Sequence, residues 1–247
     1  MPSINPNTAD TFDQIVKDRR SLRVYEENAP FDGDAVRRSL ERAVLAPNSS
    51  NLQLWEFYRI KSPEKKKEAA RLCLNQSAAR TAQELIAVVV RPDLWKPRSQ
   101  TVFETIKPSF SKPLSPKDKR AENYYTRLIP IIYSYEPTGI WNLIRGGIAF
   151  FQGLRKPFPR LVTSPESRIV VHKSASLAAQ TFMLSMKAEG YDTCPMEGFD
   201  QVRMRKFLKL PRRAEISMMI SVGVGKYPEG VYGPRFRLPN EEVIFEL

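Results

Sequence analysis

The longest uninterrupted apolar run in the chain covers residues 85–90, Leu-Ile-Ala-Val-Val-Val, and is only six residues long. A helix that spans a bilayer needs about 20 apolar residues, so this run is too short to cross a membrane. A short apolar run closed by Arg91 and Pro92 is typical of a strand buried on both faces. The chain has 247 residues, 42% of them hydrophobic, which is enough to bury such a strand in a sizeable core.

Helix and strand patterns alternate around this run. The alternation of residues 55–60 and the apolar residues of 216–224 predict two further strands. Capping residues and helical periodicity predict helices over residues 11–18, 32–46, 63–73, 165–190 and 200–208. The interleaving predicts an α/β fold, an α+β sandwich with a central mixed sheet flanked by helices, and we interpret residues 1–247 as a single domain. Gly223 and Gly225 lack the third glycine of a Rossmann fingerprint.

The bulk composition limits the chemistry that the chain can carry. The net charge is +12, and the general partners of a basic chain are nucleic acid and anionic lipid. The two cysteines, Cys73 and Cys194, form no metal motif, and no nucleophile elbow accompanies the single histidine, His172. We therefore predict no metal site. The N-terminus has neither the basic start nor the apolar stretch of a signal peptide, so we expect a cytoplasmic protein.

Residues 95–165 differ from the rest of the chain. They hold twelve Lys and Arg against four Asp and Glu, or +8 of the total charge, and nine of the 20 prolines. We interpret this segment as a basic, proline-rich insertion. Within it, residues 140–154 repeat large apolar side chains at helical spacing. Three roles remain open: packing on the core or on a partner subunit, a lid over an active site, or contact with a membrane surface through about residues 139–156.

Two polar clusters have the chemistry to bind a phosphate and a heterocycle. Residues 19–25, Arg-Arg-Ser-Leu-Arg-Val-Tyr, gather three guanidinium groups and a hydroxyl, which suit phosphate oxygens. Residues 46–57 read Ala-Pro-Asn-Ser-Ser-Asn-Leu-Gln-Leu-Trp-Glu-Phe. Their amides both donate and accept, so they can bind a ring edge that alternates carbonyls and N–H groups. A phosphate and such a ring together describe flavin mononucleotide (FMN).

These clusters resemble the early signature of the FMN-dependent nitroreductase superfamily, Arg-(Arg/His)-Ser-x-(Arg/Lys)-x-(Phe/Tyr) followed by Ala-Pro-Ser-Ser-x-Asn-x-Gln-Pro-Trp. The similarity recurs in residues 174–182, 190–200 and 235–239, so that it covers about residues 10–92 and 166–247. It implies a nitroreductase-like fold assembled as an intertwined homodimer with an exchanged C-terminal tail. Residues 242–247 read as a strand that could pair across the interface.

The resemblance also implies a set of cofactor contacts. The phosphate and nearby ribityl oxygens would be held by Arg19, Ser21, Arg235 and Arg237, with further FMN contacts from Arg20 and Arg23. The pyrimidine ring would face Asn75, the ribityl chain would pass Ser174, and flavin N5 and O4 would meet a turn formed by Pro195, Met196, Glu197 and Gly198. The second chain would contribute Pro47, Ser49, Asn51 and Gln53, with Asn48 in place of the family's first serine. No catalytic side chain is implied, because hydride transfer belongs to the cofactor.

The function that the resemblance implies is an FMN-dependent oxidoreductase. NADH or NADPH would reduce FMN, which would then reduce a small electrophilic acceptor such as a nitroaromatic or a quinone. Leu54 and Ala78 depart from the family pattern and bear on redox potential and acceptor preference. Relatives with the same fold dehalogenate reductively or oxidise a substrate, and this alternative stays open. So does a non-enzymatic protein that binds polyanions or membranes through the insertion, although we expect no nucleic-acid partner for the enzyme.

Overall fold

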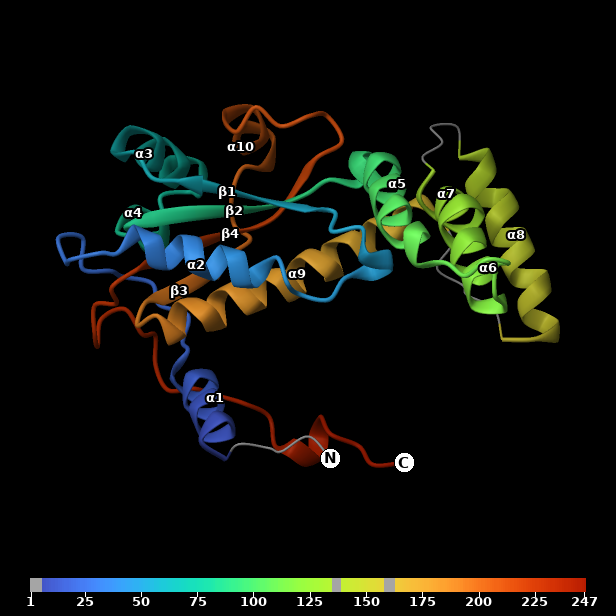
Figure 1. Ribbon diagram of the computed structural model, residues 1–247. Helices are drawn as coiled ribbons and strands as arrows, with labels where there is room; N and C mark the ends of the chain where they lie inside the picture. The colour runs from blue at the N-terminus through green and yellow to red at the C-terminus, as the bar shows by residue number, and fades with distance from the viewer. Residues whose placement is uncertain (1–5, 135–138, 158–162) are drawn as a thin grey trace.

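The computed structural model describes residues 6–134, 139–157 and 163–247 and contains a four-stranded sheet (Figure 1). The order across the sheet is β1 (Trp55–Ile60), β2 (Glu84–Val90), β4 (Glu215–Gly223) and β3 (Asp192–Met196). Every pair of neighbouring strands is antiparallel. The mixed character expected of the sheet is therefore limited to an isolated parallel bridge between Ser21 and Thr193.

Helices cover both faces of the sheet, as the predicted sandwich requires. One layer consists of α3 (Pro63–Leu72), α4 (Ser77–Arg80) and α10 (Gln201–Phe207). The other consists of α2 (Gly33–Ala43) and the long α9 (Ser164–Ala188), while α1 (Pro6–Asp18) lies outside the sandwich near the C-terminal end of α9 (Figure 1). The predicted α/β sandwich is confirmed, and most predicted elements shift by only a few residues at their ends.

Strand β2 connects the two halves of the core. All seven of its residues are buried. Leu85, Ala87 and Val89 pack with α3, α4 and α10, whereas Ile86, Val88 and Val90 pack with α2 and α9. Because successive strand residues point to opposite faces, a continuous apolar run is what a strand between two helical layers needs.

Residues 95–134 and 139–157 form a helical subregion at one end of the molecule (Figure 1). It contains α5 (Trp95–Ile106), α6 (Pro116–Asn123), a π-helix (Tyr124–Leu128), α7 (Ile129–Tyr133) and α8 (Ile140–Arg155). Of the three roles left open for residues 140–154, packing of the large apolar side chains on this chain's own core is not observed, because only Arg145 and Ala149 of α8 are buried. No helix in the described ranges combines the length and apolarity needed to cross a bilayer.

The C-terminal tail contradicts one prediction. Residues 242–247 form no strand; a 3-10 turn at Asn240–Glu242 is followed by irregular chain. A strand needs a neighbour to satisfy its N–H and C=O groups, and this exposed tail has none within the described chain. It instead runs past α1, away from the sheet (Figure 1).

Candidate functional site

Five arginines from the two ends of the chain gather beside β3. Arg19 and Arg20 follow directly after α1, and Arg23 lies three residues further on. Arg235 reaches back from the tail, where its Nη2 donates to the carbonyl of Arg19 at 2.5 Å. Arg20 Nη2 donates in turn to the carbonyl of Gly233 at 2.9 Å. We call Arg19, Arg20, Arg23, Arg235 and Arg237 the arginine cluster.

The arginine cluster holds its positive charge without a counter-charge. Burial lowers the pKa of Arg19, and the neighbouring guanidinium groups of Arg235 and Arg237 lower it further. In the described part of the chain, no carboxylate lies within ion-pair distance of any of the five guanidinium groups. Arg19 and Arg20 are half-buried, and Arg23, Arg235 and Arg237 are exposed. Guanidinium groups that repel one another and have no carboxylate partner in the described chain can bind an anion.

The floor of the arginine cluster is built by β3. The N–H of Leu22 donates to the carbonyl of Thr193 at 3.1 Å, next to the parallel bridge that fixes Ser21. Burial raises the pKa of the Cys194 thiol, which the nearby guanidinium of Arg23 opposes. The same guanidinium lies 4.7 Å from the ring centroid of Tyr232, a cation–π contact that sequence reasoning missed.

The predicted turn at residues 195–198 is shorter than expected. Pro195 and Met196 belong to β3, where they pair with β4, and only Glu197 and Gly198 lie in the exposed turn. The side chain of Gln76, which sequence reasoning also missed, donates from Nε2 to the carbonyl of Gly198 at 2.6 Å. Because Asn75 directly precedes Gln76, this bond places the turn near the exposed Asn75.

The polar turn after α2 is held in a strained conformation. We call residues 47–53, which include the exposed Pro47, the amide turn. Asn48 closes it, because its Oδ1 accepts from the N–H of Gln53 at 2.7 Å. Ser50, Asn51 and Gln53 have φ values of 58°, 53° and 49°, in the left-handed region that side chains rarely adopt. Backbone strain of this kind persists where surrounding structure enforces it, often at functional sites.

Three tyrosines of the 95–165 segment support the amide turn. The Tyr124 hydroxyl lies 2.7 Å from Ser50 Oγ, and the Tyr125 hydroxyl donates to the carbonyl of Ser50 at 3.2 Å. Tyr133 donates to Ser49 Oγ at 3.3 Å. Burial raises the pKa of Tyr125 and of Tyr133, so both hydroxyls keep their protons at neutral pH and can donate. The segment thus sets the shape of the turn from 74 to 84 residues away.

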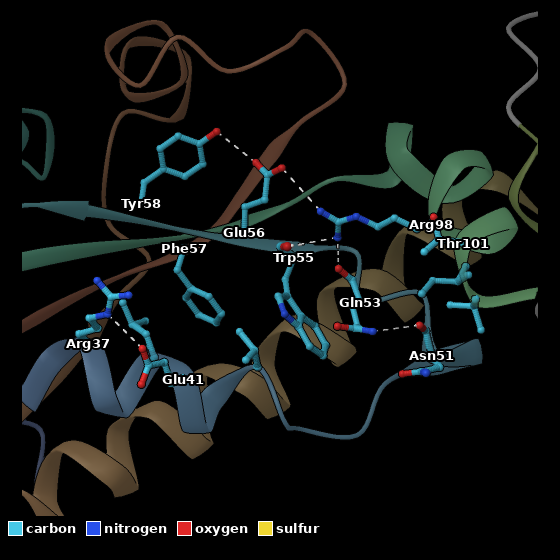
Figure 2. A pocket seen from close by; sticks show the side chains of 14 residues that line it. Arg37, Glu41, Asn51, Gln53, Trp55, Glu56, Phe57, Tyr58, Arg98 and Thr101 are labelled. Atoms are coloured by element: carbon cyan, nitrogen blue, oxygen red, sulfur yellow. Dashed lines mark hydrogen bonds and ion pairs between the residues drawn. The ribbon is translucent and has the colours of Figure 1, made fainter. Parts of the chain in front are cut away.

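A cleft of about 840 Å³ opens beside the amide turn (Figure 2). Asn51 and Gln53 form one edge, and the guanidinium of Arg98 from α5 donates to the carbonyls of Gln53 and Trp55. The cleft is lined by residues of α2, the amide turn, β1 and α5: Arg37, Leu40, Glu41, Val44, Asn51, Leu52, Gln53, Trp55, Glu56, Phe57, Tyr58, Arg98, Thr101 and Val102. The arginine cluster contributes nothing to this lining.

The sequence profile of the Nitroreductase family matches residues 16–224. The chain belongs to the nitroreductase family. Protein DrgA of Synechocystis sp. is 29% identical over 214 residues, which cover 87% of this chain and 83% of that protein. YdgI of Bacillus subtilis, assigned as an NAD(P)H nitroreductase, is 26% identical over 234 residues, or 94% of this chain and 95% of its own.

A solved structure from Exiguobacterium sibiricum, assigned as a nitroreductase and determined in complex with FMN, is also similar. It superimposes with a TM-score of 0.67 at 26% identity, over 96% of this chain and 97% of that chain. The chain therefore has the nitroreductase fold.

Within one chain, the two halves of the predicted site lie apart. Ser174 Oγ accepts from the N–H of Ser49 at 3.2 Å, which places Ser174 beside the amide turn and not beside the arginine cluster. Helix α9 then continues to Ala188 before β3 begins, a rise of roughly 21 Å at about 1.5 Å per residue. The amide turn and the arginine cluster are therefore on opposite sides of this rise.

Proposed function

We propose that the protein is an FMN-dependent oxidoreductase that uses NADH or NADPH to reduce a small electrophilic acceptor. The observation that carries the proposal is the arginine cluster, whose five guanidinium groups have no carboxylate of the described residues within ion-pair distance. A dianionic phosphate offers oxygens that such groups bind in charge-assisted hydrogen bonds. Membership of the nitroreductase family and the FMN-bound relative support the choice of this cofactor.

The described residues fit FMN in two further ways. The turn at Glu197 and Gly198 is exposed and lies next to the exposed Asn75, so its backbone is accessible to a ligand. Of the six described non-glycine residues with positive φ, five lie in the amide turn or at Leu74 and Asn75. Strained backbone thus concentrates in the two turns that the resemblance assigns to the flavin.

Each group of residues then has a separate task. Arg19, Arg235 and Arg237 would bind the phosphate, and Arg23 would place a cation near the ring, where it favours developing negative charge. Bound FMN would supply the redox chemistry, accepting hydride from NADH or NADPH and passing it to the acceptor. The aromatic side chains of the cleft beside the amide turn suit a flat acceptor such as a nitroaromatic or a quinone.

We further propose that a complete site is shared between two copies of the chain. The rise of roughly 21 Å along α9 supports this arrangement, because one chain does not bring its own amide turn to its own arginine cluster. In a homodimer, Arg19, Arg23, Asn75 and Glu197 of one chain would face Pro47, Ser49, Asn51 and Gln53 of the other.

Purification in the presence of FMN tests the proposal. We expect a yellow protein that releases FMN on denaturation and oxidises NADH or NADPH when a nitroaromatic or quinone is added. Arg237→Ala should weaken FMN binding about 10- to 100-fold, because a charge-assisted bond is worth roughly 1.5–3 kcal/mol. A protein that stays colourless after FMN is added would sink the proposal.

A further inference from the structure

Helix α8 carries its apolar side chains on the outside. Its buried positions are Arg145 and Ala149, and Arg145 Nη2 donates to the carbonyl of Ser134 at 3.2 Å. The side chains of Leu143, Phe151 and Leu154 are in contrast 83%, 69% and 67% exposed. An ordinary surface helix turns its charged side chains to water and its apolar stripe to the core, so α8 is inverted.

The exposed apolar residues form one continuous face. Successive helical residues differ by about 100° around the axis, and this spacing places the large apolar residues within roughly half of the circumference. We call six of them the α8 outer face: Leu143, Ile144, Ile148, Phe150, Phe151 and Leu154. The helix lies at the outer edge of the molecule, at the end opposite α3 and α4 (Figure 1). An exposed apolar patch of this kind marks an interaction surface.

Charge identifies the partner that suits this surface. From Gly139 to Lys156 the chain has no Asp or Glu, and the exposed Arg155 and Lys156 stand at the end of the helix. The whole 95–165 segment has a net charge of +8. Two copies meeting through this segment would bring like charges together, whereas an anionic lipid surface attracts basic residues near an apolar face.

The dimensions of α8 agree with a helix that lies on a membrane. The helix has 16 residues and is about 24 Å long, shorter than the hydrocarbon core of a bilayer. A helix lying in the interface buries only its apolar face among the acyl chains. We propose that the α8 outer face docks the protein on membranes that contain anionic phospholipids, with α8 parallel to the surface.

Co-sedimentation of the full chain with vesicles tests this proposal. We expect binding to vesicles of phosphatidylglycerol and phosphatidylcholine in equal parts, and much weaker binding to phosphatidylcholine alone. Leu143→Glu combined with Phe151→Glu should reduce binding roughly tenfold or more, because the double variant puts two carboxylates on the α8 outer face, which would lie among the acyl chains when the protein is bound. Leu45→Glu with Val202→Glu, the same change at exposed apolar positions elsewhere, should leave binding unchanged.

Two further measurements separate the possible outcomes. Arg155→Gln with Lys156→Gln should weaken binding to the anionic vesicles roughly fivefold or more, and high salt should act in the same direction. Equal vesicle binding by the wild type and the Leu143→Glu/Phe151→Glu variant would overturn the proposal. So would a changed molar mass of that variant in light scattering, because it would make the α8 outer face a contact between copies. FMN content, measured in parallel, keeps this result independent of the proposed redox function.

Discussion

At the N-terminal half of α9, Ser174 and three tyrosines form hydrogen bonds with Ser49 and Ser50 of the amide turn. Beyond the C-terminal end of α9, five arginines gather, and no carboxylate of the described residues lies within ion-pair distance of them. The first region is neutral, internally bonded and strained in its backbone. The second is positively charged, and no carboxylate of the described residues pairs with it. A binding site assembled from both would take its shape from the amide turn and its affinity for an anion from the arginine cluster.

The arginines near the C-terminal end of α9 also differ from one another in whether a carboxylate pairs with them. Arg38 and Arg42 of α2 reach Glu189, directly after α9, at 2.6 and 2.5 Å. Their charge is neutralised by the protein, and the bonds hold α2 against α9. Arginines on the same side of the molecule thus divide into a group that stabilises the fold and a group that remains available for a ligand.

The largest expected effect separates these two groups of arginines. Arg19→Gln combined with Arg237→Gln should weaken FMN binding roughly 100-fold or more, because two charge-assisted contacts are lost. The melting temperature of the apoprotein should stay constant or rise, since burial and then repulsion from Arg235 and Arg237 lower the pKa of Arg19 and so disfavour its charged form in the folded chain. Fluorescence titration with FMN and thermal unfolding measure the two quantities.

The matched control removes the same charge from the neutralised group. Arg38→Gln with Arg42→Gln should lower the melting temperature and leave FMN affinity unchanged. If both double variants weakened FMN binding equally, long-range charge would explain the effect, and the arginine cluster would lose its special role.

Mixed dimers test whether the two regions meet across chains. Arg19→Ala and Asn51→Ala should each impair FMN-dependent turnover when present in both chains. In a mixed dimer, one site would carry both lesions and the other would carry none, so about one intact site should recover. Turnover by doubly tagged, purified mixed dimers measures this recovery. If both groups served the same site from one chain, no mixed dimer would regain activity.

A smaller effect is expected from the support of the amide turn. Tyr124→Phe removes the hydroxyl that lies 2.7 Å from Ser50 Oγ. A net hydrogen bond is worth about 1 kcal/mol, so FMN affinity should fall by roughly fivefold. Tyr191→Phe is the control, because that hydroxyl accepts from the N–H of Asp32 at 2.8 Å, away from the amide turn. Equal affinity losses in the two variants would argue against a local effect.

The smallest effect concerns Glu189 and appears as a pH dependence. Hydrogen bonds from Arg38, and then from Arg42, lower the pKa of Glu189 to about 2 from an ordinary value of 4.5. A lowered pKa contributes stability that is complete above pH 4.5 and is lost as the pH falls toward 2. Glu189→Gln should therefore lower the melting temperature by a few degrees at neutral pH, and the difference should vanish in acid.

Glu41→Gln provides the comparison for this test. Glu41 pairs with Arg37 on the exposed surface of α2 at 3.0 Å, where solvent screens the interaction. Its melting temperature should match the wild type across the same pH range. A Glu189 variant that behaved in the same way would show that the clamp between α2 and α9 does not stabilise the fold.

Sequence patterns predict those strands and helices whose burial is determined by their own residues. The apolar run of β2 predicts a strand that is buried on both faces, and the periodicity of α9 predicts a helix that is buried on one face. Both elements form as expected. Strand β3 escaped prediction because Pro195 lacks an N–H and reads as a turn. At the edge of a sheet, where β3 lies, a strand tolerates a proline.

The remaining features depend on contacts between distant segments. The apolar spacing of α8 predicts an amphipathic helix, but it does not predict whether the apolar face packs on the protein or is exposed, because a helix can pack through either face. The bonds from Tyr124 and Tyr133 to the amide turn join residues 74 and 84 positions apart. Neither residue belongs to a motif, so only the folded chain reveals them.

The π-helix formed by Tyr124–Leu128 limits how the chain can change in length. A π-turn closes with hydrogen bonds five residues apart and so holds one residue more than an α-turn. Deleting one residue there would restore α-helical winding with the two flanks still in phase, but Tyr124 and Tyr125, which lie in the π-turn itself, would shift relative to Ser50. Insertions and deletions between relatives should therefore accumulate in loops such as residues 110–114 and avoid this turn.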